Sequence, residues 1–227
     1  MKIIPELRPR LRTIASFMLP EASVADVGSD HALLPIYLVG QGIARTAVAS
    51  DVHTEPYLRA KAAVLAYDMQ DRISVLHADG LSGLDAYRPD HIIVAGMGGE
   101  LIAQILEASE YPKTSKCRLI LQPMTHAADV RRWLSCHGFS ILEEALPTEG
   151  ERIYEIIVAV YDGSIHNLTP LEELLGPCNL QHRNEVFLQF ARRRYDTLKK
   201  QVDARRKAMT NTESEASAES EASAESE

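Results

Sequence analysis

The chain has 227 residues, 45% of them hydrophobic, and a formal net charge of −8. This content can bury the core of one medium-sized domain and leave an appendage. No uncharged apolar stretch approaches the length of a membrane span and no signal peptide is visible, so we expect a cytoplasmic protein without membrane contact. The widely spaced cysteines, Cys117, Cys136 and Cys178, indicate reduced thiols rather than disulfides or a zinc site.

Most of the negative charge lies at the C-terminal end. Residues 210–227 contain six Glu and no basic residue, so the preceding 209 residues together carry only −2. The segment repeats Glu-Ser-Glu-Ala-Ser-Ala from Glu213 and has nothing to pack into a core. Composition therefore predicts a disordered, solvating tail, with an acidic interaction tail as the alternative.

The first predicted elements are a helix and a strand that ends in a glycine turn. Apolar spacing predicts a helix over 5–19 and a strand over 23–27. Gly28 then opens a strand–turn–helix unit typical of nucleotide-binding α/β domains. Asp30 and Leu33 stand where a dinucleotide-binding turn carries its second and third glycines. A carboxylate there would repel a pyrophosphate but would suit an ammonium or sulfonium group, which favours S-adenosylmethionine over a dinucleotide.

Strands and helices alternate through the rest of the first 162 residues. The further predicted elements are strands at 46–50, 73–76, 91–95 and 118–122 and helices at 54–67, 100–108 and 127–137. This alternation predicts βαβ units in a parallel sheet. The last two strands, Phe139–Ala145 and 152–161, are separated only by a polar turn and should pair antiparallel at the edge. The pattern predicts an α/β fold of class I methyltransferase (Rossmann-like) type, with a mostly parallel seven-stranded sheet and an antiparallel edge hairpin.

The pattern changes near residue 163. Three leucines form a short apolar patch, a Gly-Pro pair interrupts it, and a long helical pattern follows. Residues 180–209 hold nine Lys or Arg against three Asp or Glu. We therefore predict a catalytic domain with an N-terminal helix (1–162), a basic, coiled-coil-like helical appendage (163–209) and the acidic tail (210–227). The candidate RNA-binding residues are Arg192, Arg193, Arg194, Lys199, Lys200, Arg205 and Arg206. A solvated helix face is the alternative for this charge run.

Three acidic residues follow three successive predicted strands. Asp26 could hold a methionine ammonium, Asp51 could accept both ribose hydroxyls, and Asp79, followed by Gly80, could accept the adenine amino group. Each alone is equally explained as a turn or helix-capping residue. Their series favours a ligand, because the carboxyl edge of such a sheet is where α/β folds bind. The predicted cofactor site comprises Asp26, Gly28, Ser29, Asp30, His31, Asp51, Asp79 and Gly80.

Two further turns follow the fourth and fifth strands. Gly96, Met97, Gly98 and Gly99 leave backbone amides bare, although a tight strand-to-helix turn is the alternative. Gln122, beside the rigid Pro123, could read a base edge through its donor and its acceptor, or could cap a helix or satisfy the core. We predict that these two turns form a base pocket. The eight histidines show no metal-binding spacing, so we expect no metal, and His31 could contact the cofactor.

Several motifs resemble one known family. They are Gly-Ser-Asp-His-Ala-x-Leu-Pro at 28–35, Ala-Gly-Met-Gly-Gly at 95–99, Leu-Gln-Pro-Met at 121–124, Glu-Gly-Glu-Arg-x-Tyr-Glu at 149–155 and Leu-Gly-Pro at 175–177. The chain is similar, over about residues 5–208, to bacterial tRNA adenine-N1-methyltransferases of the TrmK type. The resemblance implies methylation of N1 of an adenine in the D-loop region of tRNA, with S-adenosyl-L-methionine as donor and a helical coiled-coil appendage. Two departures concern the cofactor cleft: Asp51 replaces the usual Glu, and Ala63 replaces an expected Asn.

The resemblance makes tRNA the expected partner, and we expect a monomer. N1 of adenine carries its own lone pair, so the enzyme has to expose and align that atom rather than generate a nucleophile. Two other readings stay open. One is a non-catalytic RNA-binding or cofactor-sensing protein on the same fold, which has no use for an open base pocket. The other is a methyltransferase for another RNA or for a small molecule, which has no use for a basic helix.

Overall fold

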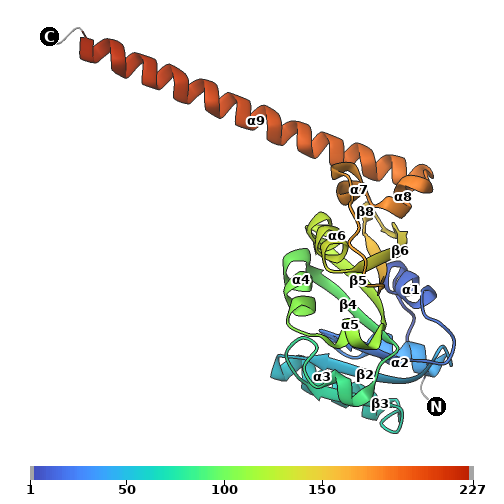
Figure 1. The fold of residues 1–227 in the computed structure, drawn as a ribbon. Coiled ribbons are helices and arrows are strands. Elements are labelled where there is room, and N and C mark those ends of the chain that lie inside the picture. The colour runs from blue at the N-terminus through green and yellow to red at the C-terminus, as the bar shows by residue number, and fades with distance from the viewer. Residues whose placement is uncertain (1–2, 225–227) are drawn as a thin grey trace. The chain divides into compact units, whose positions relative to one another are not determined.

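The computed structural model describes residues 3–224, with side chains through residue 206. The chain divides into two compact units, Met1–His182 and Arg183–Glu227. In the first unit a seven-stranded sheet lies between helices on both of its faces (Figure 1). The helices α7 (Pro170–Leu175) and α8 (Pro177–Gln181) belong to this unit, so the division falls later than the predicted boundary after residue 162.

The large sheet has the strand order expected of a class I methyltransferase. In spatial order its strands are β3 (Ile73–His77), β2 (Ala44–Asp51), β1 (Ala22–Val27), β4 (His91–Gly98), β5 (Arg118–Thr125), β9 (Ile156–Tyr161) and β6 (Phe139–Ala145). The first five pair in parallel, and β9 pairs antiparallel with both β5 and β6. This confirms the predicted mostly parallel sheet with an antiparallel edge pair.

The segment between β6 and β9 differs from the prediction of one continuous strand over 152–161. A separate hairpin of β7 (Thr148–Glu149) and β8 (Arg152–Ile153) precedes β9. Tyr154 and Glu155 lie between β8 and β9, and the Tyr154 amide donates to the carbonyl of Pro147 at 2.9 Å. The chain bends here because the Glu155 carboxylate pairs with a buried arginine beneath the hairpin.

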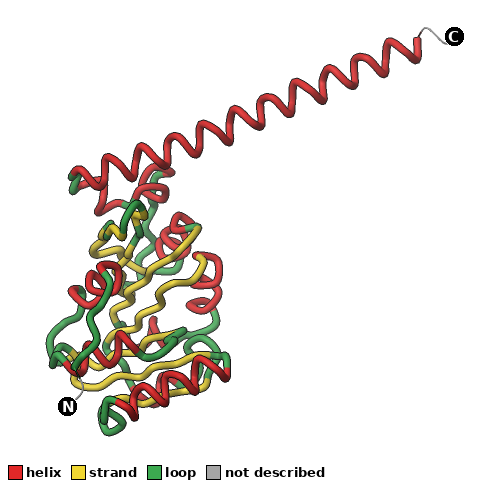
Figure 2. Tube along the Cα trace, turned by 180° about the vertical axis from the view of Figure 1, so that it is seen from behind, coloured by secondary structure: helices red, strands yellow, loops and turns green. Residues whose placement is uncertain are grey.

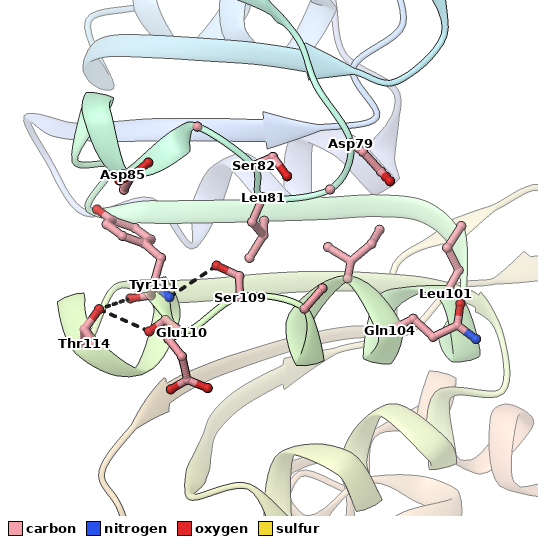
Figure 3. A pocket seen from close by; sticks show the side chains of 14 residues that line it. Asp79, Leu81, Ser82, Asp85, Leu101, Gln104, Ser109, Glu110, Tyr111 and Thr114 are labelled. Atoms are coloured by element: carbon pink, nitrogen blue, oxygen red, sulfur yellow. Dashed lines mark hydrogen bonds between the residues drawn. The ribbon is translucent and has the colours of Figure 1, made fainter.

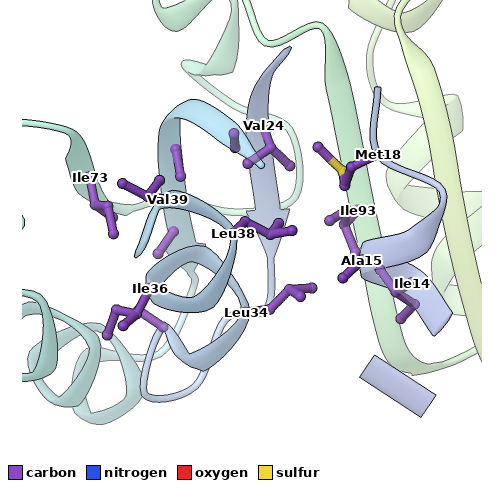
Figure 4. Close-up of a cluster of buried hydrophobic side chains, with 14 of the residues drawn as sticks. Ile14, Ala15, Met18, Val24, Leu34, Ile36, Leu38, Val39, Ile73 and Ile93 are labelled. Atoms are coloured by element: carbon purple, nitrogen blue, oxygen red, sulfur yellow. The ribbon is translucent and has the colours of Figure 1, made fainter. Parts of the chain in front are cut away.

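One face of the sheet is covered by α1 (Pro9–Ser16), α2 (Leu33–Gly40) and α3 (Thr54–Ala66). Figure 4 shows side chains of the first two helices, among them Ile14 and Leu38, gathered against Val24 and Ile93 of the sheet. The helix α1 is shorter than the predicted 5–19, and Met18 beyond its end still packs into the same cluster.

The other face is covered by α4 (Gly99–Glu107), α6 (Ala127–Cys136) and the short 3₁₀ helix η1 (Leu84–Tyr87). Neighbouring residues of a strand point to opposite faces, so Ile93 joins the first cluster whereas Ile92 and Val94 join the second. The remaining short helix, α5 (Tyr111–Ser115), precedes β5. The helices therefore exclude water from both faces of the central strands. A ligand can reach these strands at the carboxyl edge of the sheet.

A buried ion cluster fastens α8 to this unit. Arg131 of α6 pairs with Glu144 of β6 at 2.7 Å and with Glu155 at 2.8 Å, and the side chains of Arg131 and Glu144 are fully buried. The second Glu144 oxygen accepts the backbone amide of Cys178 at 2.9 Å, at the start of α8. A Cβ on Gly176 would lie 2.3 Å from that carboxylate, so only glycine fits there.

The second unit contains one long helix, α9 (Glu185–Ala224), seen as an uninterrupted coil in Figure 2. The helix continues through residues 210–224 of the acidic segment, which composition predicts to be disordered. Residues 225–227 of that segment lie outside the described part. Ala and Glu, which alternate with Ser there, are good helix formers, and this favours continuation of a helix that has already begun. None of the helices in the described residues is long and apolar enough to cross a membrane.

Candidate active site

The predicted site residues gather at the carboxyl edge of the sheet. The strand order reverses between β1 and β4, because the chain adds β2 and β3 on one side and β5 on the other. Such a switch point leaves a crevice beyond the strand ends, where α/β folds bind their ligands. Asp26 and Asp51 lie at the ends of β1 and β2, and Gly96 lies at the end of β4.

Asp26 is the most perturbed acid of this edge. It is 8% exposed, and its carboxylate accepts the Ser29 hydroxyl at 2.6 Å. Burial raises its pKa to about 6, although the Ser29 hydrogen bond and the charge of Arg10 act in the lowering direction. A buried carboxylate with little positive charge around it is suited to receive the cationic group of a ligand.

The turn after β1 is shaped by Gly28. Its φ of +75° favours glycine, and a Cβ there would lie 2.2 Å from the methyl carbon of Met97. The amides of Gly28 and Ser29 both donate to the carbonyl of Ser50, at 2.8 and 2.9 Å, which ties the turn to the end of β2. Glycine at position 28 therefore lets the Met97 side chain of the glycine-rich turn lie directly beside the backbone, and the approach of a ligand there stays a prediction.

Asp30 and His31 interact with protein groups in the turn after β1. The Asp30 carboxylate pairs with Arg59 of α3 at 2.8 Å, and this hydrogen bond lowers its pKa. His31 has a φ of +62°, is largely exposed, and lies 3.7 Å from the same carboxylate. The spacing argument correctly excludes a pyrophosphate turn, but the charge of Asp30 is already balanced by an arginine that is distant in sequence.

Asp51 is held in a fixed orientation at the end of β2. One oxygen of its side chain accepts the His53 amide at 2.8 Å and lies 3.1 Å from Nδ1 of the same residue. Its other oxygen has no hydrogen bond among those found in the described residues and remains for a ligand hydroxyl. The carbonyl of Asp51 accepts the amide of Ala78, so the turns after β2 and β3 are joined.

Asp79 and Gly80 lie at the rim of a pocket of about 540 Å³ between the turn after β3 and α4 (Figure 3). Asp79 is exposed, and Gly80 has a φ of +53° with Ile105 at ordinary contact distance. Figure 3 shows Leu81 and Leu101 on the two sides of this pocket. The pocket is wide enough for a flat heterocycle between apolar walls, which agrees with the predicted adenine-binding role of this turn.

The glycine-rich turn after β4 has two different constraints. Gly96 is exposed with a φ of +82°, but its amide is not bare, because it donates to Oε1 of Gln122 at 3.1 Å. Gly99 is buried at the start of α4, and a Cβ there would lie 2.2 Å from the carbonyl oxygen of His126. The tight strand-to-helix turn, given as the alternative, therefore fits Gly99, which permits close packing of α4 on the turn after β5. The place of Gly96 beside a ligand stays a prediction.

Gln122 fits the core-satisfying alternative and not the base-reading role. It is fully buried, its Oε1 accepts the amide of Gly96 at 3.1 Å and the guanidinium of Arg10, and its Nε2 donates to the carbonyl of Pro123 at 2.9 Å. Both ends of the amide are thus used inside the protein, and Pro123 is buried as well. Gln122 positions the Gly96 turn and cannot in this arrangement read a base edge.

Two residues of this region escaped the sequence reasoning. Arg10 of α1 reaches Gln122 and lies over the ring of Tyr154, 5.5 Å from its centroid, while its backbone amide donates to Glu149 at 2.9 Å. Tyr154 and Glu149 both belong to the Glu-Gly-Glu-Arg-x-Tyr-Glu motif. That motif is the sequence feature that points to Tyr154 and Glu149. The contacts of Arg10 depend on where α1 packs, which the spacing of apolar residues along the chain does not reveal.

The basic residues predicted to bind RNA all lie on α9 and none belongs to the crevice. Arg192 pairs with Asp196 at 3.5 Å, and Arg194 lies over the Phe190 ring at 5.2 Å. In the first unit, ligand atoms of Glu100, His126 and Asp129 lie within 4.8 Å of one another, but these side chains are at or near the surface, where acidic groups commonly gather without an ion.

Comparisons with known proteins agree with this geometry. A family model described as a methyltransferase domain matches residues 7–157. The tRNA (adenine(22)-N(1))-methyltransferase of Bacillus subtilis (strain 168) is 39% identical over 191 residues, which cover 81% of this chain and 79% of that protein. The chain belongs to the TrmK family of class I methyltransferases. The crystal structure of the B. subtilis TrmK m1A22 tRNA methyltransferase superposes with a TM-score of 0.73 at 38% identity, covering 81% and 80% of the two chains.

A second TrmK-like structure bears on the cofactor. A Streptococcus pneumoniae protein solved in complex with S-adenosyl-L-methionine is 36% identical, with a TM-score of 0.80 over 86% of this chain and 90% of that chain. The residues of the present chain fit the same ligand: a buried carboxylate at Asp26 for a cationic group, and at Asp51 a carboxylate oxygen for a ribose hydroxyl. The contacts of Asp30 and Gln122 depart from expectation.

Proposed function

We propose that this protein transfers the methyl group of S-adenosyl-L-methionine to N1 of an adenine in tRNA, at the position that corresponds to adenine 22. The observation that carries the proposal is the 39% identity, over 81% of the chain, to the B. subtilis enzyme named for that reaction. The crevice supports it, because its acids suit a cationic ligand and its turns lack the glycine spacing for a pyrophosphate.

The residues of the chain divide between two tasks. Asp26, Asp51 and the turn of Asp79 and Gly80 would hold the ammonium, ribose and adenine of the cofactor, which supplies an electrophilic methyl group on a sulfonium. Gly96, at the end of β4, leaves its backbone open where the target base must enter. The protein has to remove that base from its stack and align its N1, which is a matter of proximity and orientation.

The product base carries a positive charge until its exocyclic amine releases a proton. Asp26 is a buried acid at the end of β1, and the charge of Arg10 acts on it. A carboxylate at this edge would favour positive charge as it develops on the base. No general base is required by this chemistry, since the attacking nitrogen has its lone pair at neutral pH.

The test is incubation of the full chain with labelled S-adenosyl-L-methionine and tRNA from a strain that lacks this modification, followed by nucleoside analysis. We expect label in 1-methyladenosine and a reverse-transcription stop at position 22. A tRNA with guanosine at position 22 is the matched control and should stay unlabelled. Cofactor binding without transfer would instead identify a sensing or RNA-binding protein, and label in another nucleoside would identify a different site of action.

A further inference from the structure

The N-terminal helix and the β7–β8 hairpin meet at the end of β5. The backbone amide of Arg10 donates to Glu149 of the hairpin at 2.9 Å, and the Arg10 guanidinium lies 5.5 Å from the centroid of Tyr154. Because β9 runs antiparallel to β5, with Leu121 opposite Ile157, Tyr154 precedes β9 at the carboxyl end of β5. The pair therefore lies at the edge of the sheet where the ligands bind.

The same guanidinium reaches the turn that opens the crevice. It donates to Oε1 of Gln122, the oxygen that also accepts the Gly96 amide. A Cβ built on Gly96 would lie 3.8 Å from the guanidinium nitrogen Nη1, and the charge of Arg10 is felt by Asp26. Arg10 thus connects Tyr154, Gln122 and the Gly96 turn in one cluster.

The half of the crevice beyond β4 and β5 needs a group that recognises a base. Asp26, Asp51 and Asp79 lie on the β1, β2 and β3 side, and the amide of Gln122 is consumed by internal hydrogen bonds. Tyr154 is half-buried, so the residue is not enclosed in the core. Aromatic rings are the side chains on which extruded bases stack.

We propose that Tyr154 is the stacking platform for the target adenine. Arg10 is a positioning residue that fixes the Tyr154 ring and the Gly96 turn relative to each other. The inference rests on the proposed function, because it requires a base as methyl acceptor. Arg10 acts through its neighbours. Its guanidinium lies over the Tyr154 ring and fixes the position of that ring. The guanidinium also binds Oε1 of Gln122, which accepts the Gly96 amide, and so fixes the backbone of the Gly96 turn.

The experiment measures single-turnover methyl transfer and the fluorescence of 2-aminopurine placed at position 22 of the tRNA. Tyr154→Leu should slow transfer by about 5- to 100-fold, the range expected from the loss of one base–aromatic stack, and should leave the bound 2-aminopurine brighter than in the native complex. Tyr154→Phe keeps the ring and should retain both values. Cofactor affinity should stay within twofold, because Tyr154 is on the acceptor side.

Tyr87→Leu is the matched control. Tyr87 is an exposed tyrosine near Ser23 and Thr46, at the amino ends of β1 and β2, and its replacement should change neither measurement. Arg10→Met should slow transfer and Arg10→Lys should restore part of the rate. If Arg10 works through Tyr154, the double variant Arg10→Met/Tyr154→Leu should be no slower than the slower single variant, because coupled effects do not multiply.

The possible outcomes separate the two proposals. A native chain that methylates tRNA while Tyr154→Leu matches its rate and its fluorescence would overturn the stacking platform and leave the proposed function intact. Multiplying effects of Arg10→Met and Tyr154→Leu would overturn the claim that Arg10 positions the Tyr154 ring. A native chain that binds the cofactor but modifies no tRNA would reject the proposed function, and the inference about the base pocket with it.

Discussion

Asp26 shows how one buried carboxyl joins stability to ligand binding. In the folded chain its pKa is raised to about 6 from a usual 3.8, chiefly because it is buried. Between about pH 4 and 6 the folded state therefore keeps a proton that the unfolded state has released. By linkage, the free energy of unfolding falls as pH rises through this window. Above about pH 6 the buried carboxylate is charged, and the full cost of burying that charge lowers the stability of the fold.

Asp26→Asn removes this titration while keeping the shape of the side chain. Without cofactor, the variant should be more stable than the native chain at pH 7, by at most about 3 kcal/mol for two pH units, and the difference should shrink toward pH 4. Its affinity for S-adenosyl-L-methionine should fall by about 1–3 kcal/mol, because a charge-assisted partner is lost. Urea unfolding at several pH values and calorimetric titration measure the two effects; parallel stability curves in both chains would contradict the assignment.

Two adjacent glycines give a residue-scale test of packing at the start of α4. Neither has a positive φ, but a Cβ on Gly99 would lie 2.2 Å from the His126 carbonyl oxygen, whereas one on Gly98 would lie 3.4 Å from the Thr125 hydroxyl. Gly99→Ala should therefore lower the free energy of unfolding by about 1–3 kcal/mol through overpacking against backbone. Gly98→Ala is the control and should change it by less than about 0.5 kcal/mol. Equal losses in both variants would show that backbone freedom, not close approach, explains Gly99.

At the scale of elements, the buried cluster of Arg131, Glu144 and Glu155 connects α6, β6, the hairpin and the start of α8. Burial alone would lower the pKa of Arg131, but the two carboxylates outweigh it and the net shift is upward, so the guanidinium stays charged. The family motifs at 149–155 and 175–177 are far apart in sequence, and this cluster is their meeting point. It also explains why α7 and α8 belong to the first unit.

Arg131→Met should cost about 3–5 kcal/mol of unfolding free energy, because two buried carboxylates lose their partner. Its neighbour Arg132, which is exposed and pairs with Glu173 at 2.7 Å and Asp129 at 3.0 Å, is the matched control. Arg132→Met should cost no more than about 1 kcal/mol, as for other surface pairs. Chemical denaturation measures both, and adding Glu144→Gln and Glu155→Gln to Arg131→Met should recover part of the loss. Similar costs for the two arginines would refute the anchoring role.

At the scale of the whole molecule, the candidate crevice and the basic helix belong to different units, and we predict that RNA affinity can be changed without changing cofactor binding. Successive helix residues turn by about 100°, so Arg193 and Lys200 lie on one line of α9, while Arg192 and Lys199 lie on a line with Asp196. The three consecutive arginines therefore cannot act as one patch. Each of the two lines is therefore a separate candidate for phosphate contacts.

Arg193→Gln/Lys200→Gln should weaken tRNA binding and reduce the magnitude of the slope of log affinity against log salt by about one to two. The reason is that binding releases fewer counterions when fewer phosphate contacts form. Arg192→Gln/Lys199→Gln removes the same charge from the other line, and comparing the two variants shows which line contacts the phosphates. Affinity for S-adenosyl-L-methionine should be the same in all chains. Binding titrations at several salt concentrations decide the matter, and an unchanged slope in the first variant would place RNA contacts elsewhere.

Local pattern was enough to predict most of the fold. The alternation of strand and helix periods predicted the α/β sheet, and the acids after successive strands predicted its binding edge, because parallel strands bring their carboxyl ends together whatever the details of packing. The break at Tyr154 and Glu155 was not predicted, since β-branched and aromatic residues continue on both sides of it. The helix through residues 210–224 was not predicted, because the prediction of disorder rested on the low apolar content of the segment. Low apolar content shows that the segment cannot form a core, but it does not exclude a single extended helix.

The sequence by itself determined the class of fold, the exclusion of a pyrophosphate turn and, through its motifs, the family to which the chain belongs. Tertiary structure alone decided which polar groups remain for ligands: Arg59 neutralises Asp30, and Arg10 with Gly96 occupies Gln122. The physical reason is that strand-end positions follow from local periodicity, whereas the partner of a charge or an amide depends on which distant helix packs beside it. Arg10 and Tyr154, 144 positions apart, become neighbours only when α1 and the hairpin have docked on the same edge of the sheet.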